Sequence, residues 1–154
     1  MAFKSTNIFF DAIEDHLRTQ MNDQLDEVTR FDGLLSEAVA YHLSKNSQAK
    51  SWLFYGFGTD APDRFSGGGS RIDSVFLMDF VIVLRTAGKS KYNQDIRDVT
   101  DISDAIIRVF DDHSKWTQPM MDNVRAMALP VRTRQRLDAG VYAHLVRFEA
   151  KPAR

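Results

Sequence analysis

Three arginines, Arg132, Arg134 and Arg136, alternate with uncharged residues near the C-terminus. Successive side chains of a β-strand point to opposite faces, so all three guanidinium groups would share one face. Guanidinium groups pair well with carboxylates or phosphates, which makes this row a candidate subunit or partner interface. In the alternative reading, the row faces solvent and its charges discourage edge-to-edge aggregation. Both readings stay open at this stage.

Asp79 is the one charged residue in the apolar run at residues 75–84. A buried carboxylate needs a hydrogen-bonding or charged partner, so we add Asp79 to the candidate interface residues. A rival interpretation makes the chain a small α+β enzyme or ligand-binding module. In that case Asp79, His144 or Tyr142 would line a pocket between the first two helices and the sheet.

Gly67, Gly68 and Gly69 form a glycine run that precedes Ser70. The run lacks the glycine, lysine and hydroxyl spacing of a phosphate-binding loop. Glycine loses much backbone entropy on ordering, so we predict a flexible loop at residues 59–72 between two strands. We include the three glycines in the candidate interface, because such a loop can become ordered on contact with a partner.

Residue types that usually carry catalysis do not form a recognisable set in this chain. The sequence has no cysteine, which excludes disulfides, thiolate catalysis and cysteine-bound zinc. Its four histidines do not occur at the spacing of metal ligands on one helix. Asp101 and Asp104 suit the start of a helix, where the dipole favours negative charge. We therefore predict a non-enzymatic protein with no catalytic, cofactor-binding or metal-binding residues and no cofactor.

The length and charge of the chain limit its partners. The 154 residues fit a single domain spanning 1–154. Twenty basic and 21 acidic residues give a net charge of -1, so no bulk electrostatic attraction to nucleic acid or anionic lipid is expected. The longest uninterrupted apolar run, residues 80–84, is far too short to span a bilayer, and the N-terminus does not read as a secretory signal.

Hydrophobic periodicity predicts an α+β fold. We expect a mainly antiparallel four-stranded sheet with helices packed on one face, in the order α-α-β-β-α-β-β. The segment at residues 22–30 reads as a loop or frayed helix, residues 87–98 as an exposed connection, and residues 114–128 as ambiguous. The expected helices are a first one capped by Ser5 or Thr6, a second at 34–43 and a third at 100–113; the expected strands are 52–57, 74–85, 131–137 and 141–149.

The predicted strand at residues 74–85 is apolar on both faces, which is typical of a strand covered on both sides. The helices of the chain can cover one face. The other face needs a different cover, and in a chain this small a neighbouring subunit is a candidate.

In element order and length, the chain resembles the tail terminator (tail completion) proteins of long-tailed bacteriophages, a group related to minor tail and neck proteins. The first strand at residues 52–56 and the long apolar strand at 75–84 carry this resemblance, together with the N-terminal helix. The helix at residues 101–107 and the hairpin strand at 140–148 complete it. The segment at residues 22–47 departs from the simplest family pattern.

The resemblance implies a structural virion protein of the tail or neck, assembled in the host cytoplasm. It implies a homo-oligomeric ring, usually six-fold, that caps the tail tube and joins it to the head. The implied partners are the tail tube protein and a head-connector or neck protein, with no membrane and no sequence-specific nucleic acid. A closed ring uses head-to-tail contacts between two different patches of each subunit.

Overall fold

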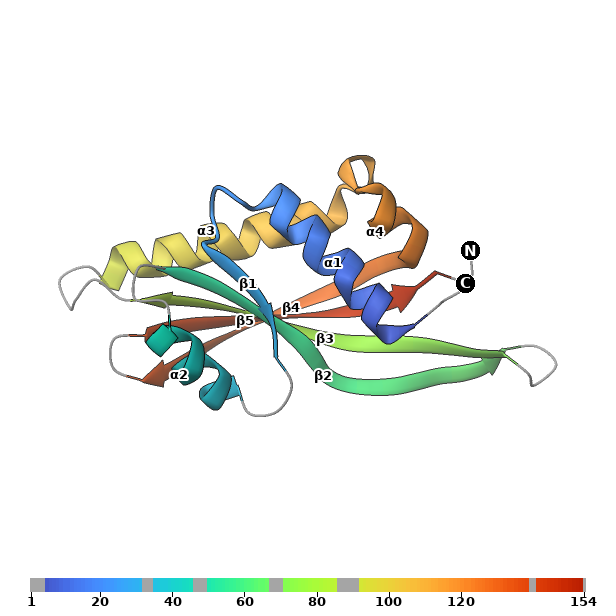
Figure 1. Ribbon diagram of the computed structural model, residues 1–154, viewed down its shortest axis with the longest axis horizontal. Helices are drawn as coiled ribbons and strands as arrows, with labels where there is room; N and C mark the ends of the chain where they lie inside the picture. The colour runs from blue at the N-terminus through green and yellow to red at the C-terminus, as the bar shows by residue number, and fades with distance from the viewer. Residues whose placement is uncertain are drawn as a thin grey trace.

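The computed structural model describes residues 5–31, 35–45, 50–66, 71–85, 92–138 and 141–153, in which helices pack on a twisted sheet (Figure 1). The elements in chain order are α1 (Thr6–Gln20), β1 (Glu27–Arg30), α2 (Leu35–Lys45), β2 (Ser51–Ser66), β3 (Arg71–Arg85), α3 (Tyr92–Asp111), the 3-10 helix η2 (His113–Lys115), α4 (Gln118–Asn123), β4 (Val124–Asp138) and β5 (Val141–Pro152).

The sheet of the described residues has five strands in the order β1-β2-β3-β5-β4. The α+β class is confirmed, but the predicted four-stranded antiparallel sheet is wrong. Residues 27–30 form an edge strand that pairs parallel with Trp52–Tyr55 of β2, whereas the other neighbouring strands pair antiparallel. The sequence does not predict β1, because the strand is short and polar and is stabilised by pairing with a distant segment.

Several elements are longer than the sequence predicts. Helix α3 begins at Tyr92 rather than near Thr100, so the expected connection at residues 87–98 is wrong from residue 92 onward. The ambiguous segment at 114–128 contains the end of η2, all of α4 and the start of β4. Strand β2 runs to Ser66 and β3 starts at Arg71, so strand pairing extends into the expected loop at 59–72. Gly67, Gly68 and Gly69 lie outside the described residues.

Helix α1 forms where its sequence supplies both a cap and an apolar stripe. The hydroxyl of Ser5 accepts a hydrogen bond from the backbone N–H of Ile8, which satisfies one of the free donors at the helix start. Phe9, Ile13 and Leu17 are buried on one side of the helix. The hydroxyl of Tyr55 in β2 donates to Glu14 at 3.0 Å and ties the helix to the sheet. Burial and the nearby Glu14 carboxylate both raise the pKa of Tyr55.

Helix α3 covers the centre of the sheet with Ile102, Ile106 and Phe110. The ring of Phe110 lies 5.2 Å from that of Phe80 and 5.2 Å from that of Phe148, measured between centroids. These three aromatic side chains join the helix to β3 and β5. We call the side of the sheet that α1 and α3 cover the main face.

The opposite side, which we call the second face, is covered by α2. Trp52 and Phe54 of β2 lie on it together with Val81 and Val83 of β3, and Val39 of α2 packs against this group. Leu53 and Tyr55, which alternate with these residues, are buried on the main face. The prediction that all helices pack on one face is therefore wrong. An amphipathic pattern shows that a helix covers a sheet, but it does not show which face.

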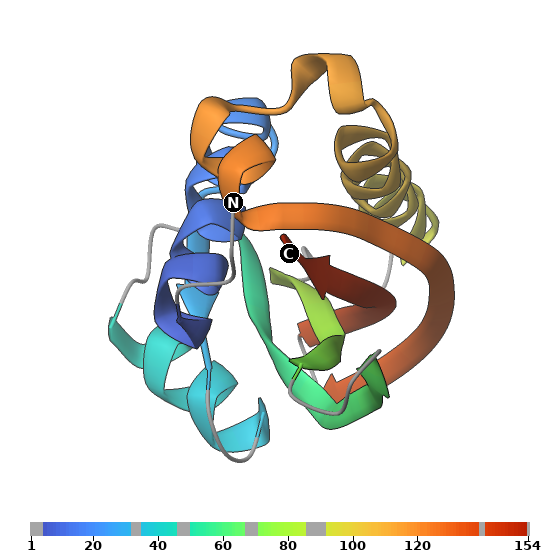
Figure 2. The same ribbon diagram turned by 90° about the vertical axis from the view of Figure 1, so that its right-hand side faces the viewer.

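Strands β2 and β3 extend beyond the rest of the sheet as a two-stranded arm. The ladder between β3 and β5 ends at the pair Phe76 and Ala150, whereas β2 and β3 stay paired as far as Ser66 and Arg71. Figure 1 shows this arm running on to the right, past α1 and past the ends of β4 and β5. Viewed along the long axis, β4 sweeps around β5 in a wide arc (Figure 2).

None of the helices within the described ranges is long and apolar enough to cross a membrane.

Candidate assembly surface

The centre of the second face carries an ion pair between β3 and β5. Asp79 and Arg147 lie opposite each other in the ladder. Arg147 donates from Nε to one carboxylate oxygen at 2.6 Å and from Nη2 to the other at 3.0 Å. This bidentate pairing raises the pKa of Arg147. Asp79 therefore has the partner that its position requires, and the partner comes from the chain itself.

The rival pocket with Asp79 and His144 is wrong in its geometry. Asp79 pairs with Arg147 on the second face, while His144 pairs with Ile82 on the main face. Side chains on opposite faces of a sheet cannot converge on one ligand. Helices α1 and α2 also lie on opposite faces, so they do not enclose a common pocket with the sheet.

Beyond α2, the second face is only partly covered. Val75 and Leu77 of β3 and Glu149 of β5 are partly exposed there. Val131 of β4 lies opposite Arg147 and is 58% exposed. Apolar strand residues thus reach solvent around the Asp79–Arg147 pair, next to the residues that α2 covers.

The arginine row lies on strand β4, at the edge of the sheet. The ladder pairs Arg132 with Val146, Arg134 with His144 and Arg136 with Tyr142, which places all three positions on the main face. Arg132 forms an ion pair with Asp104 of α3 at 2.6 Å. Both side chains are well exposed, at 39% and 42%, so this pair contributes at most about 1 kcal/mol.

One feature of this edge was missed from the sequence. Leu129 has a φ of 53° and is 65% exposed, at an irregularity of the β4–β5 ladder between Ala128 and Val131. A leucine in this left-handed region is unusual and strained. Pro130 directly after it was the available signal, because proline within a strand pattern marks an edge strand or a bulge.

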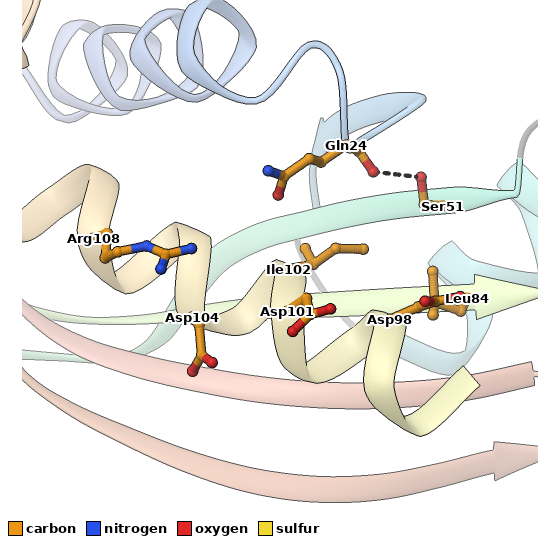
Figure 3. A pocket seen from close by; sticks show the side chains of 8 residues that line it. All are labelled: Gln24, Ser51, Leu84, Asp98, Asp101, Ile102, Asp104 and Arg108. Atoms are coloured by element: carbon orange, nitrogen blue, oxygen red, sulfur yellow. Dashed lines mark hydrogen bonds between the residues drawn. The ribbon is translucent and has the colours of Figure 1, made fainter. Parts of the chain in front are cut away.

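A groove of about 430 Å³ runs between α3 and the turn after α1. Gln24 and Arg108 point toward one another across it, and Ser51 donates to the backbone oxygen of Gln24 at 3.1 Å (Figure 3). Asp98 and Asp101 line its α3 side and are exposed. Within the described ranges, no cluster of three or more histidine and carboxylate side chains is arranged to hold a metal ion. Charged and polar side chains of α3 and of the turn after α1 thus line the groove.

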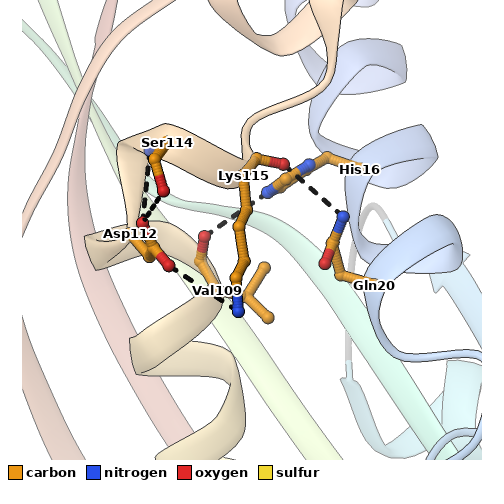
Figure 4. Close-up of polar contacts among 6 residues, drawn as sticks. All are labelled: His16, Gln20, Val109, Asp112, Ser114 and Lys115. Atoms are coloured by element: carbon orange, nitrogen blue, oxygen red, sulfur yellow. Dashed lines mark hydrogen bonds and ion pairs between the residues drawn. The ribbon is translucent and has the colours of Figure 1, made fainter.

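His16 is a buried polar link between α1 and the segment that follows α3. Its Nδ1 accepts from the backbone N–H of Thr117 at 3.4 Å, which leaves Nε2–H to donate to the carbonyl of Val109 at 3.4 Å. Gln20, one turn later in α1, donates to the carbonyl of Lys115 (Figure 4). Burial lowers the pKa of His16, and the Val109 carbonyl and Asp15 oppose this only in part.

The depressed pKa predicts that His16 makes the protein less stable in acid. The unfolded chain takes up a proton near pH 6.5, while the folded chain resists it, so the free energy of unfolding falls as the pH drops through that value. The stability difference between the native chain and His16→Gln, measured by urea denaturation from pH 8 to pH 5, should shrink toward low pH. A difference that stays constant over this range would contradict the prediction, because all other titrating groups are common to both proteins.

Comparisons with known proteins give no family assignment. No protein-family model matches the chain, and no curated protein sequence matches it. Among solved structures, a chain from a structure titled "Virion of native gene transfer agent (GTA) particle" superposes with a TM-score of 0.48. The match covers 94% of this chain and 90% of that chain at 10% sequence identity. A likeness of this degree assigns neither a family nor a function to this chain.

Proposed function

We propose that the chain is a structural virion protein of a tailed-phage type: a ring-forming subunit, similar to tail terminators, that caps the tail tube and joins it to the head or neck. The observation that carries this proposal is the incomplete second face. Its own helix α2 covers the part around Trp52 and Phe54, and another part exposes Val131 near Leu77 and the Asp79–Arg147 pair. A second copy of the chain is the cover that a ring supplies.

The shape of the sheet supports the same proposal. A two-stranded ribbon is only marginally stable in water, and the β2–β3 arm has just this form beyond Phe76. A neighbouring subunit would add packing to this two-stranded arm. The strained, exposed Leu129 on β4 also suits a contact point, because strain persists where the structure or its partner requires it.

Within this proposal, Arg134 and Arg136 of β4, the glycine run Gly67, Gly68 and Gly69 between β2 and β3, and Asp79 remain the candidate interface. Arg132 and Asp79 have smaller roles, since Arg132 pairs with Asp104 and Asp79 pairs with Arg147 of the same subunit. The further partners are the tail tube protein and a head-connector or neck protein, and the ring is six-fold. The subunit has no catalytic function, and its site of action is the tail or neck of the virion.

The proposal predicts that the purified protein forms a closed oligomer of defined size. Light scattering during gel filtration should show a mass that increases with concentration and then stops at a fixed multiple of the subunit mass. Negative-stain images of that fraction should show rings with a central hole. A protein that remains monomeric at high concentration would refute the proposed ring.

Arg134→Glu is the matched variant for this measurement. We expect it to shift the subunit–ring equilibrium toward monomer, since it reverses a charge on the edge strand, while the circular dichroism spectrum stays native. Arg97→Glu, at an exposed position of α3 outside β2 and β4, controls for the loss of positive charge alone. If ring formation by Arg134→Glu equals that of the native chain, the arginine row is solvated surface.

A further inference from the structure

The two outer edges of the sheet differ in charge. One edge is formed by β1, but β1 pairs only with residues 52–55 of β2, so among the described strands β2 is itself the edge strand from residue 57 to residue 66. That free stretch contains Asp60, Asp63 and Arg64. The other edge is β4, which contains four arginines and one aspartate. The free stretch of β2 thus carries two carboxylates and one guanidinium group, a net charge of -1, whereas β4 carries a net charge of +3.

We propose that the free edge of β2 in one subunit docks against β4 of the adjacent subunit, with the aspartate positions of β2 alongside the arginine positions of β4. This inference rests on the proposed ring and names the contact that closes it. Carboxylates and guanidinium groups form the stronger class of hydrogen bonds, so the arrangement gives the arginine row a specific partner.

The position of the two edges favours a second copy of this chain as the occupant. The free stretch of β2 and strand β4 lie at opposite edges of the same sheet. A contact between them therefore joins two different patches of the subunit. Such a head-to-tail contact, repeated with one rotation, closes into a ring. Contact between two copies of the basic β4 edge would instead bring like charges together.

Strand β1 also fixes where the neighbour can bind. It occupies the edge of β2 up to Tyr55, and the backbone N–H of Phe31 adds a further bond to the Tyr55 carbonyl. The incoming β4 must therefore lie past Tyr55, along the arm. Pro62 lacks a backbone donor and lies at a ladder irregularity, so a continuous backbone ladder is blocked there. Side-chain pairing consequently carries the contact.

The absence of cysteine makes a disulfide test direct. We would combine Asp60→Cys or Asp63→Cys with Arg132→Cys, Arg134→Cys or Arg136→Cys, giving a small set of double variants that samples the possible registers. Under mild oxidation, at least one should convert monomer bands into a ladder of covalent multimers that ends at the subunit number of the ring. A disulfide forms only when the two Cα atoms lie within about 7 Å, so cross-linking reports close contact.

The controls separate this contact from the ring itself. Each single-cysteine variant should stay uncross-linked, because the two edges differ, and so should Asp60→Cys combined with Thr19→Cys on the exposed side of α1. Rings seen by light scattering without cross-linking in any double variant would overturn the proposed contact and leave the ring standing. Native protein that forms no ring would overturn both.

A charge exchange provides an independent readout. Asp60→Arg with Asp63→Arg should abolish ring formation, since both edges are then basic. Adding Arg134→Asp and Arg136→Asp to the same chain should restore it. Failure of this exchange to restore rings, while the native chain forms them, would count against pairing between these two edges.

Discussion

Replacing Phe110 by alanine is expected to lower the free energy of unfolding by about 3–5 kcal/mol, as for other large aromatic side chains removed from a core. Phe110 is fully buried, and its ring contacts those of Phe80 and Phe148. Its backbone oxygen also accepts a hydrogen bond from the indole N–H of Trp116 at 3.2 Å. A cavity at this point would loosen α3 from both central strands.

Urea denaturation followed by circular dichroism measures this loss. Arg97→Ala, at an exposed position of the same helix, is the matched control and should change stability by less than about 0.5 kcal/mol. A cost below about 1 kcal/mol for Phe110→Ala would show that the aromatic cluster does not anchor α3. The cluster lies in the main-face core, away from the proposed β2–β4 contact, so a concentrated sample of the variant that is still folded should form rings.

The periodic elements of this fold could be predicted from the sequence. The apolar stripe from Ile102 to Phe110 and the Ser5 cap of α1 identify two helices directly, because both signals lie within one segment. The stripe reaches back into the second turn of α3 through Ile96 and Val99, and Val99 is fully buried in the main-face core. The charged residues around them, Asp95, Arg97 and Asp98, made the segment read as polar. Extending a helix costs less than starting a new one, which favours helix in this segment.

Features that depend on pairing between distant segments could not be predicted. Strand β1 has four residues, and its main support is the parallel ladder with Trp52–Tyr55. The alternation of Arg132, Arg134 and Arg136 correctly placed them on one face of a strand, but only the register with β5 shows that it is the face of α3. Likewise, Asp79 required a partner, yet Arg147 lies 68 residues away and no local pattern links them.

Gly56→Ala tests the junction where β1 leaves the sheet. Gly56 lies opposite Asp79 on β3, and a Cβ atom at this position would lie only 2.5 Å from the backbone oxygen of Phe31. The backbone of Phe31 is held in place, because its N–H donates to the Tyr55 carbonyl at 2.9 Å. We expect a loss of about 1–3 kcal/mol, the usual cost of forcing extra volume into a packed site. The smaller backbone entropy of unfolded alanine offsets at most about 1 kcal/mol of it.

A double-mutant cycle with Phe31→Ala identifies the cause of that loss. The nearest ring atoms of Phe31 would lie 3.5 and 3.6 Å from the new Cβ, which is ordinary contact, whereas the backbone oxygen would clash. Truncating the ring leaves that oxygen in place, so Gly56→Ala should cost about as much in the Phe31→Ala background as in the native chain, measured by urea denaturation. If the cost disappears in that background, the ring of Phe31 is the obstacle. In that case the backbone of β1 moves away from β2 at little cost. Strand β1 would then block the edge of β2 up to Tyr55 less firmly than the proposed assembly requires.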